Sequence, residues 1–129
     1  MTPWIKVALI GSFAVIVFDV VASVASRVFS FPFTKASIGS FAIYFAVGYF
    51  AARATDQSRV WVALLADVFV GFTDGTIGWA VSFLIGPGRP KTELTFGRWL
   101  FSCGFVILTA VIFGIIASLF VRNPFILRR

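Results

Sequence analysis

The chain has 129 residues, of which 60 % are apolar, 18 % aromatic and 12 % charged, and its formal net charge is +6. A soluble domain carries about 25 % charged residues, and a domain this small has too little interior to hide 17 phenylalanines from water. The composition therefore excludes a soluble class. It predicts one all-α integral membrane domain, residues 1–129, with the lipid bilayer as its partner.

The positive charge does not indicate nucleic acid, because the basic residues lie at the ends of apolar runs, where lipid headgroups lie. The chain has no His and a single Cys, Cys103, which excludes a His/Cys metal site, a Cys–His nucleophile pair and an intrachain disulfide. We find no phosphate-binding loop, nucleophile elbow or catalytic triad. We therefore expect no metal and no cofactor, and we do not favour an enzyme.

Four apolar runs predict four transmembrane helices, since a helix needs roughly 20 residues to cross the hydrocarbon. Their continuous apolar character favours helices over a membrane barrel, whose strands would alternate. In chain order the predicted helices cover about residues 4–28, 36–54, 60–85 and 97–121.

The connections between these helices are short and carry turn residues. Residues 86–91, for example, contain two prolines and two glycines, which do not continue a helix. Connections this short make neighbouring helices antiparallel. We therefore predict two helical hairpins.

The two hairpins could be copies of one another. Shifting the chain by 55 residues places Asp19 on Asp74 and Pro32 on Pro87, and nine of 44 aligned positions are identical. Shared apolar composition accounts for part of these identities, so an internal parallel duplication is a hypothesis, with a pseudo-twofold axis along the membrane normal.

Four crossings place both termini on one side of the membrane, which we expect to be the plasma (inner) membrane. That side carries six basic residues and the other carries five, so the positive-inside rule favours cytoplasmic termini only slightly. Insertion in both orientations, giving antiparallel dimers, stays open.

Asp19, Asp67 and Asp74 are the acidic residues deep within the apolar runs. A carboxylate at the bilayer centre costs roughly 2.5–3.5 kcal/mol or more, and such residues often mark ion or proton pathways. An ideal α-helix places Asp67 and Asp74 on nearly the same face. Asp19 and Asp74 would face each other if the first and third helices met, and two facing carboxylates either share a proton or hold a cation. These three are our ion- or proton-binding candidates, with Lys6 and Arg53 as bases that could reach Asp67.

Gly71, Gly75 and Gly78, at steps of three and four, form a stripe on the third helix on roughly the face of Asp67 and Asp74, which we call the glycine stripe. Such small residues offer a different interpretation, in which the stripe serves helix packing. A buried Asp can then simply hydrogen-bond to a neighbouring helix. The helix-packing candidates are Gly71, Gly75, Gly78, Ala110, Gly114 and Ser118.

Aromatic and basic residues near the helix ends fit the interfacial belt, and we assign Trp4, Arg27, Trp61 and Trp99 as interfacial anchors. Trp79 and Tyr44 lie further inside their helices, where they either line a cavity or pack, and packing is the favoured interpretation.

Together these features favour a small transporter or channel for protons or small cations that uses intramembrane carboxylates. Four short helices make only a thin wall, so a central aqueous path would need two or more copies of the chain. We therefore expect a homo-oligomer, with the glycine stripe or the fourth helix as the interface. The alternative is a non-catalytic accessory or assembly subunit of a larger membrane complex, or a lipid-interacting structural protein.

Overall fold

The computed structural model describes residues 1–56 and 58–121, and this part of the chain contains helices and no strand. The elements are α1 (Pro3–Phe29), the 3-10 turn η1 (Phe33–Ala36), α2 (Ser37–Arg53), α3 (Arg59–Thr73), the π-helix η2 (Asp74–Gly78), α4 (Trp79–Ile85) and α5 (Phe96–Leu119).

Four helical spans are long and apolar enough to cross a membrane. They are Pro3–Phe29, Phe33–Arg53, Arg59–Ile85 and Phe96–Leu119. This confirms the prediction of an all-helical, multipass membrane protein with four candidate spans. The 27-residue first and third spans exceed the roughly 20 residues that a crossing needs.

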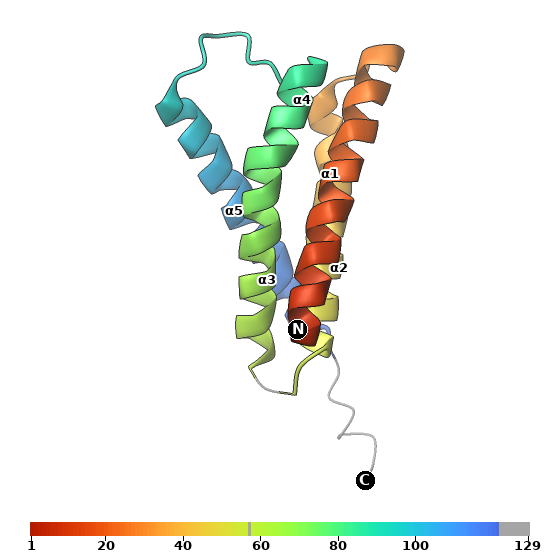
Figure 1. The fold of residues 1–129 in the computed structure, drawn as a ribbon, viewed down its shortest axis with the longest axis vertical. Coiled ribbons are helices and arrows are strands. Elements are labelled where there is room, and N and C mark those ends of the chain that lie inside the picture. The colour runs from red at the N-terminus through yellow and green to blue at the C-terminus, as the bar shows by residue number, and fades with distance from the viewer. Residues whose placement is uncertain (57, 122–129) are drawn as a thin grey trace.

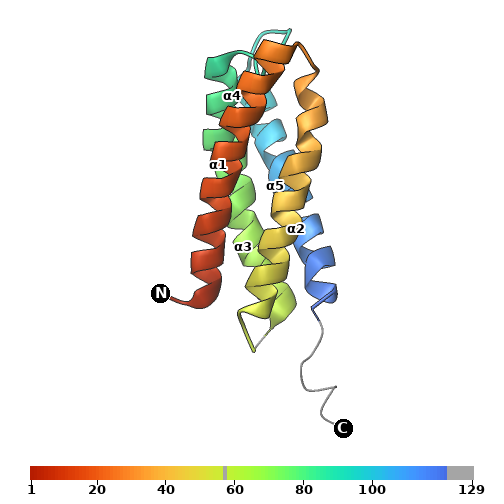
Figure 2. The same cartoon turned by 90° about the vertical axis from the view of Figure 1, so that its right-hand side faces the viewer.

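Successive spans run up and down the long axis (Figures 1 and 2). The connections at residues 30–32 and 86–95 lie at the upper end of Figure 1, and α1 begins and α5 ends at the lower end. Among the described elements, α2 and α3 contact each other and both outer helices, whereas no Cα atom of α1 lies within 8 Å of one in α5. At the upper end α5 diverges from α4 (Figure 1).

Small side chains form the interior of the lower half. Ala51, Ala63, Ala66 and Ala110 are fully buried, and their size lets helix backbones approach closely. Large apolar side chains such as Phe13 and Phe101 point outward, which lipid permits and water does not. The bundle is therefore held by close backbone packing rather than by a core of large side chains.

A π-helix interrupts the third span at Asp74–Gly78, where the backbone N–H of Trp79 donates to the carbonyl of Asp74, five residues earlier. The wider turn changes the direction in which the following residues point. The span predicted over about residues 60–85 is therefore present as Arg59–Ile85, but it is not α-helical throughout. Single π-helical turns of this kind occur frequently at functional sites.

Candidate functional site

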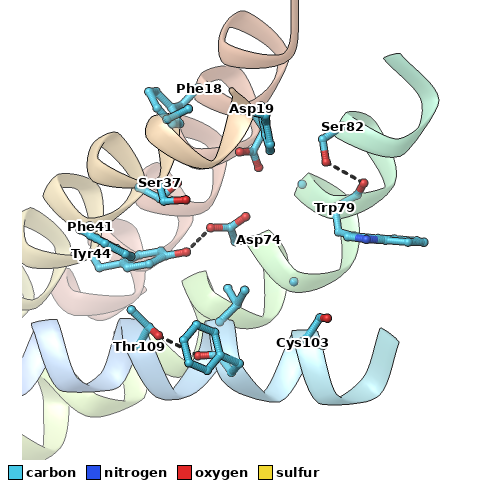
Figure 3. Close-up of a pocket in the computed structure, with 18 residues that line it drawn as sticks. Phe18, Asp19, Ser37, Phe41, Tyr44, Asp74, Trp79, Ser82, Cys103 and Thr109 are labelled. Carbon is cyan, nitrogen blue, oxygen red and sulfur yellow. Dashed lines mark hydrogen bonds between the residues drawn. The ribbon is translucent and has the colours of Figure 1, made fainter. Parts of the chain in front are cut away.

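Asp19 of α1 and Asp74 of η2 face each other across the bundle interior (Figure 3). Both lie near the middle of 27-residue spans, which places them deep in the apolar layer. Gly78, one helical turn after Asp74, makes room for the pair. A β-carbon at position 78 would collide with Asp19 Oδ2 and lie 2.9 Å from Asp74 Oδ1.

Tyr44 of α2 is the hydrogen-bond partner of this pair. Its hydroxyl donates to Asp74 Oδ2 (Figure 3), and its side chain is 2 % exposed. The sequence-based interpretation of Tyr44 as a packing residue is therefore incomplete, because its ring packs in the core while its hydroxyl belongs to the site. Three helical segments, α1, α2 and η2, each contribute one oxygen-bearing side chain.

Asp19 lacks such a donor. Its side chain is 5 % exposed, and its Oδ2 is buried with no hydrogen-bond partner in the described part of the chain. Two facing carboxylates repel each other strongly where little solvent screens them. The pair can therefore hold a proton between its two carboxyl groups, or a cation, far more cheaply than two negative charges.

The pair lies on the wall of a cavity of about 220 Å³. The cavity exists where α5 diverges from α4, and α1, α2, η2, α4 and α5 all contribute to its wall. Its hydroxyl-bearing residues are Ser37, Ser40, Tyr44, Ser82, Ser102 and Thr109, and its other aromatic residues are Phe18, Phe33, Phe41, Trp79 and Phe105.

Two of the wall hydroxyls donate locally to their own helices. Ser82 donates to the Trp79 carbonyl at 3.0 Å and Thr109 to the Phe105 carbonyl at 2.8 Å. The Asp19–Asp74 pair, with the Tyr44 hydroxyl, is therefore the strongly polar part of an otherwise largely apolar wall.

Asp67 has a different environment, although it lies only seven residues before Asp74. It is fully buried, both of its carboxyl oxygens lack a hydrogen-bond partner among the described residues, and it does not line the cavity. The suggested contacts with Lys6 or Arg53 are therefore not formed. Its carboxyl lies against two glycines, Gly48 of α2 and Gly114 of α5.

The helix-packing candidates lie inside the chain's own bundle. A β-carbon at Gly71 would lie 2.9 Å from both Ala110 Cβ and Ile107 Cα, and one at Gly75 would lie 2.7 Å from Cys103 Sγ. Ala110, Gly114 and Ser118 are buried on the facing side of α5. Gly71 and Gly75 are thus covered by α5, and Gly78 faces Asp19 of α1. An oligomer interface on the glycine stripe or on the fourth helix stays a prediction.

Arg27 holds two helices together at the upper end. Its Nη1 donates to the carbonyl of Ile85 at 3.1 Å, and so it caps the last turn of α4 from α1. Trp61 is 57 % exposed near the start of α3, Trp4 packs partly buried against the core, and Trp99 contacts Trp79 and Phe96. The assignment of these four residues as interfacial anchors stays a prediction.

The described residues contain no group of three or more His, Cys, Asp or Glu side chains able to hold a metal ion. No protein-family model, no curated protein and no solved structure matches this chain. The chemistry of the site is therefore the basis for a functional conclusion.

Proposed function

We propose that this protein is a small membrane transporter or channel for protons or small cations, in which Asp19 and Asp74 bind the transported ion. The observation that carries the proposal is the buried Asp19 carboxyl, which has an unpartnered oxygen and faces Asp74 on a cavity wall in the middle of an apolar span. We propose no catalytic role.

The energetic argument rests on burial in an apolar layer. Ionisable groups within membrane spans are costly and normally pair with each other or with basic groups. Here the three acids within the spans, Asp19 and Asp67 buried and Asp74 half-buried, have no hydrogen bond from a Lys or Arg side chain in the described part of the chain. A site with two carboxyl groups and one hydroxyl donor therefore has affinity for a positive charge, which a proton or a cation supplies.

The shape of the bundle favours a transporter over an open channel. The cavity lies towards the upper end, where α4 and α5 diverge. Below the pair, Val47, Ala51, Ala66 and Val70 pack tightly in the core. An ion in the cavity would therefore reach the other side only after the packed half rearranges, as alternating access requires.

We propose the hairpin duplication as the origin of the facing acids. The first and third spans both have 27 residues. Each is followed by a residue of positive φ, with a proline two residues after Ser30 and directly after Gly86. The second helices of the two hairpins correspond less well. The 55-residue shift aligns Tyr44 with Trp99, but Tyr44 lies well inside α2 whereas Trp99 lies in the first turn of α5. A homo-oligomer in the plasma membrane, with cytoplasmic termini, completes the proposal.

Flux through reconstituted vesicles tests this function. Vesicles holding the full chain are given a proton, Na⁺ or K⁺ gradient, and flux is followed with an internal indicator dye. We expect flux above protein-free vesicles, at least a tenfold loss in Asp19→Asn and Asp74→Asn, and retained flux in the matched control Asp67→Asn.

Absence of flux from the unmodified protein under every gradient would overturn the proposal. Equal flux in the parent and in the Asp19 and Asp74 variants would do the same. A stable heteromeric partner in native mass spectrometry, together with no flux, would instead support the accessory-subunit alternative.

A further inference from the structure

The size of the cavity bears on what it can hold. An apolar cavity of about 150 Å³ in another protein accommodates benzene, with six non-hydrogen atoms, so a cavity of about 220 Å³ has room for about nine. A bare monatomic cation would leave most of this volume unfilled. The cavity is therefore large enough for a small organic molecule.

Aromatic residues from several helices line the cavity that also holds the carboxyl pair. Figure 3 shows Phe41 and Trp79 on opposite sides of the two carboxyls, with Phe18 above them as drawn. Trp79 is held in place by ring contacts with Phe83 and Trp99, at centroid distances of 5.2 and 6.4 Å. Aromatic faces attract cations that have shed their water, and groups of such rings recognise quaternary ammonium ions.

The charge of the site selects the sign of the ligand. The carboxyl pair attracts a positive charge and repels an anion, and no cationic group hydrogen-bonds to either carboxyl in the part of the chain described. A divalent metal ion would need about six oxygen ligands, whereas the two acids stand in a wall that is mainly apolar. An organic cation matches both the apolar rings and the carboxyls.

We propose that the cavity binds a small organic monocation, an ammonium group attached to a flat apolar body, in exchange for the proton held by the Asp19–Asp74 pair. This inference rests on the proposed function, whose substrate class it names. The ammonium group lies at the two carboxyls and the apolar body lies among Phe18, Phe41 and Trp79. One cation enters as one proton leaves to solution, so the charge of the site is unchanged.

Calorimetry on the purified full chain in detergent tests the exchange, with trimethylphenylammonium as the probe. Its neutral isostere tert-butylbenzene and K⁺ are the matched ligands. We expect the organic cation to bind at least tenfold more tightly than either. While the pair is protonated, its affinity should rise about tenfold per pH unit, with about one proton released per cation in weak buffer.

Variants locate the binding site. Asp19→Asn and Asp74→Asn should weaken trimethylphenylammonium at least tenfold, and Trp79→Leu should weaken it several-fold while sparing tert-butylbenzene. Asp67→Asn, outside the cavity, should bind as the parent does. The ligand comparison on the unmodified protein decides the question even if a variant fails to fold.

Equal affinity for the cation and its neutral isostere would overturn the inference, as would binding of K⁺ alone or cation binding without proton release. These failures are separable from failure of the proposed function. If proton or K⁺ flux depends on the Asp19–Asp74 pair but no organic cation binds, the inference of an organic-cation site is overturned and the proposed function is retained. Organic-cation binding with proton release, but no flux of any ion or of the probe, would overturn the proposed transport function and support the proposed binding site.

Discussion

The upper and lower halves of the bundle place aspartate side chains in different surroundings. In the upper half Asp19 and Asp74 line a cavity of about 220 Å³ and share it with the Tyr44 hydroxyl. In the lower half Asp67 is fully buried between two glycines, lines none of the pockets found, and has no hydrogen-bond donor in the described chain. Burial alone therefore does not distinguish a binding group from a packed one.

The difference originates in what each carboxyl faces. Glycines lie beside all three acids, but Gly78 brings two carboxyls together, whereas Gly48 and Gly114 bring two backbones against one carboxyl. Close backbones exclude solvent and ligand, whereas the cavity beside Asp19 and Asp74 has room for them. We expect substitutions in the lower half to change stability and those in the upper half to change ion binding.

The largest expected effect comes from Gly114→Leu in the lower half. The new side chain would enter the space of Asp67 and the backbone of Gly48, and overpacking of this kind typically costs about 1–3 kcal/mol or more. We expect a large loss of folded protein, measured as thermal unfolding in detergent. Gly104→Leu in the same helix is the control, because a β-carbon there meets nothing within 4 Å. Equal losses in both variants would contradict the packing described here.

Gly78→Ala should distinguish most clearly an effect on ion binding from an effect on stability. The added methyl collides with Asp19 Oδ2, and a carboxyl group at the end of a side chain can move aside more easily than backbone. We therefore expect a stability loss of about 1 kcal/mol, since moderate overpacking lies at the low end of the usual range, but at least a tenfold loss of flux. Gly104→Ala, whose β-carbon would meet nothing within 4 Å, should keep the flux. Normal flux in Gly78→Ala would argue against the paired geometry.

Tyr44→Phe removes the hydroxyl that donates to Asp74 and leaves the ring in the core. A hydrogen bond of this kind contributes about 1 kcal/mol, and somewhat more to a charged acceptor. We expect a small drop in unfolding temperature and a several-fold loss of flux. Tyr49→Phe, in the same helix, is the matched control. A pH profile of flux that is identical in the two variants would show that the Tyr44 hydroxyl does not contribute to the site.

Arg27→Gln should have the smallest effect. It removes the guanidinium that caps the Ile85 carbonyl, and a cation at an exposed helix C-terminus contributes about 0.3–1 kcal/mol. Thermal unfolding should shift slightly and flux should remain near that of the parent. Lys35→Gln changes the same charge at the same end of the bundle and serves as the control. A large loss of flux in Arg27→Gln alone would mean that this residue participates in the ion path.

The sequence was sufficient for the spans because polar connections separate long apolar runs, and bilayer thickness sets the length of each run. It also indicated that Asp19 and Asp74 could meet, because both lie on small-residue stripes of helices that a duplication would relate. These features depend on local composition and on simple spacing, which a single sequence carries.

Tyr44, the π-helix and the isolation of Asp67 could not be predicted in the same way. Tyr44 sits in an apolar run, and its partner lies 30 residues away, so only the packing of α2 against η2 makes it a polar site residue. The residues Asp74–Gly78 look like ordinary helix under a 3.6-residue period. Asp67 resembles Asp74 on that period, and the backbones of Gly48 and Gly114 decide its different environment.

Labelling with a hydrophobic carbodiimide tests the central claim most directly, namely that the acids of the upper half are an accessible binding pair and the acid of the lower half is sealed. Such reagents modify protonated carboxyl groups in apolar surroundings, and mass spectrometry of the digested protein locates the modified residue. We expect modification at Asp19 or Asp74, protection of both by trimethylphenylammonium, and no modification of Asp67 in the folded protein. Modification of Asp67 at an equal or faster rate, with neither Asp19 nor Asp74 labelled, would contradict the claim.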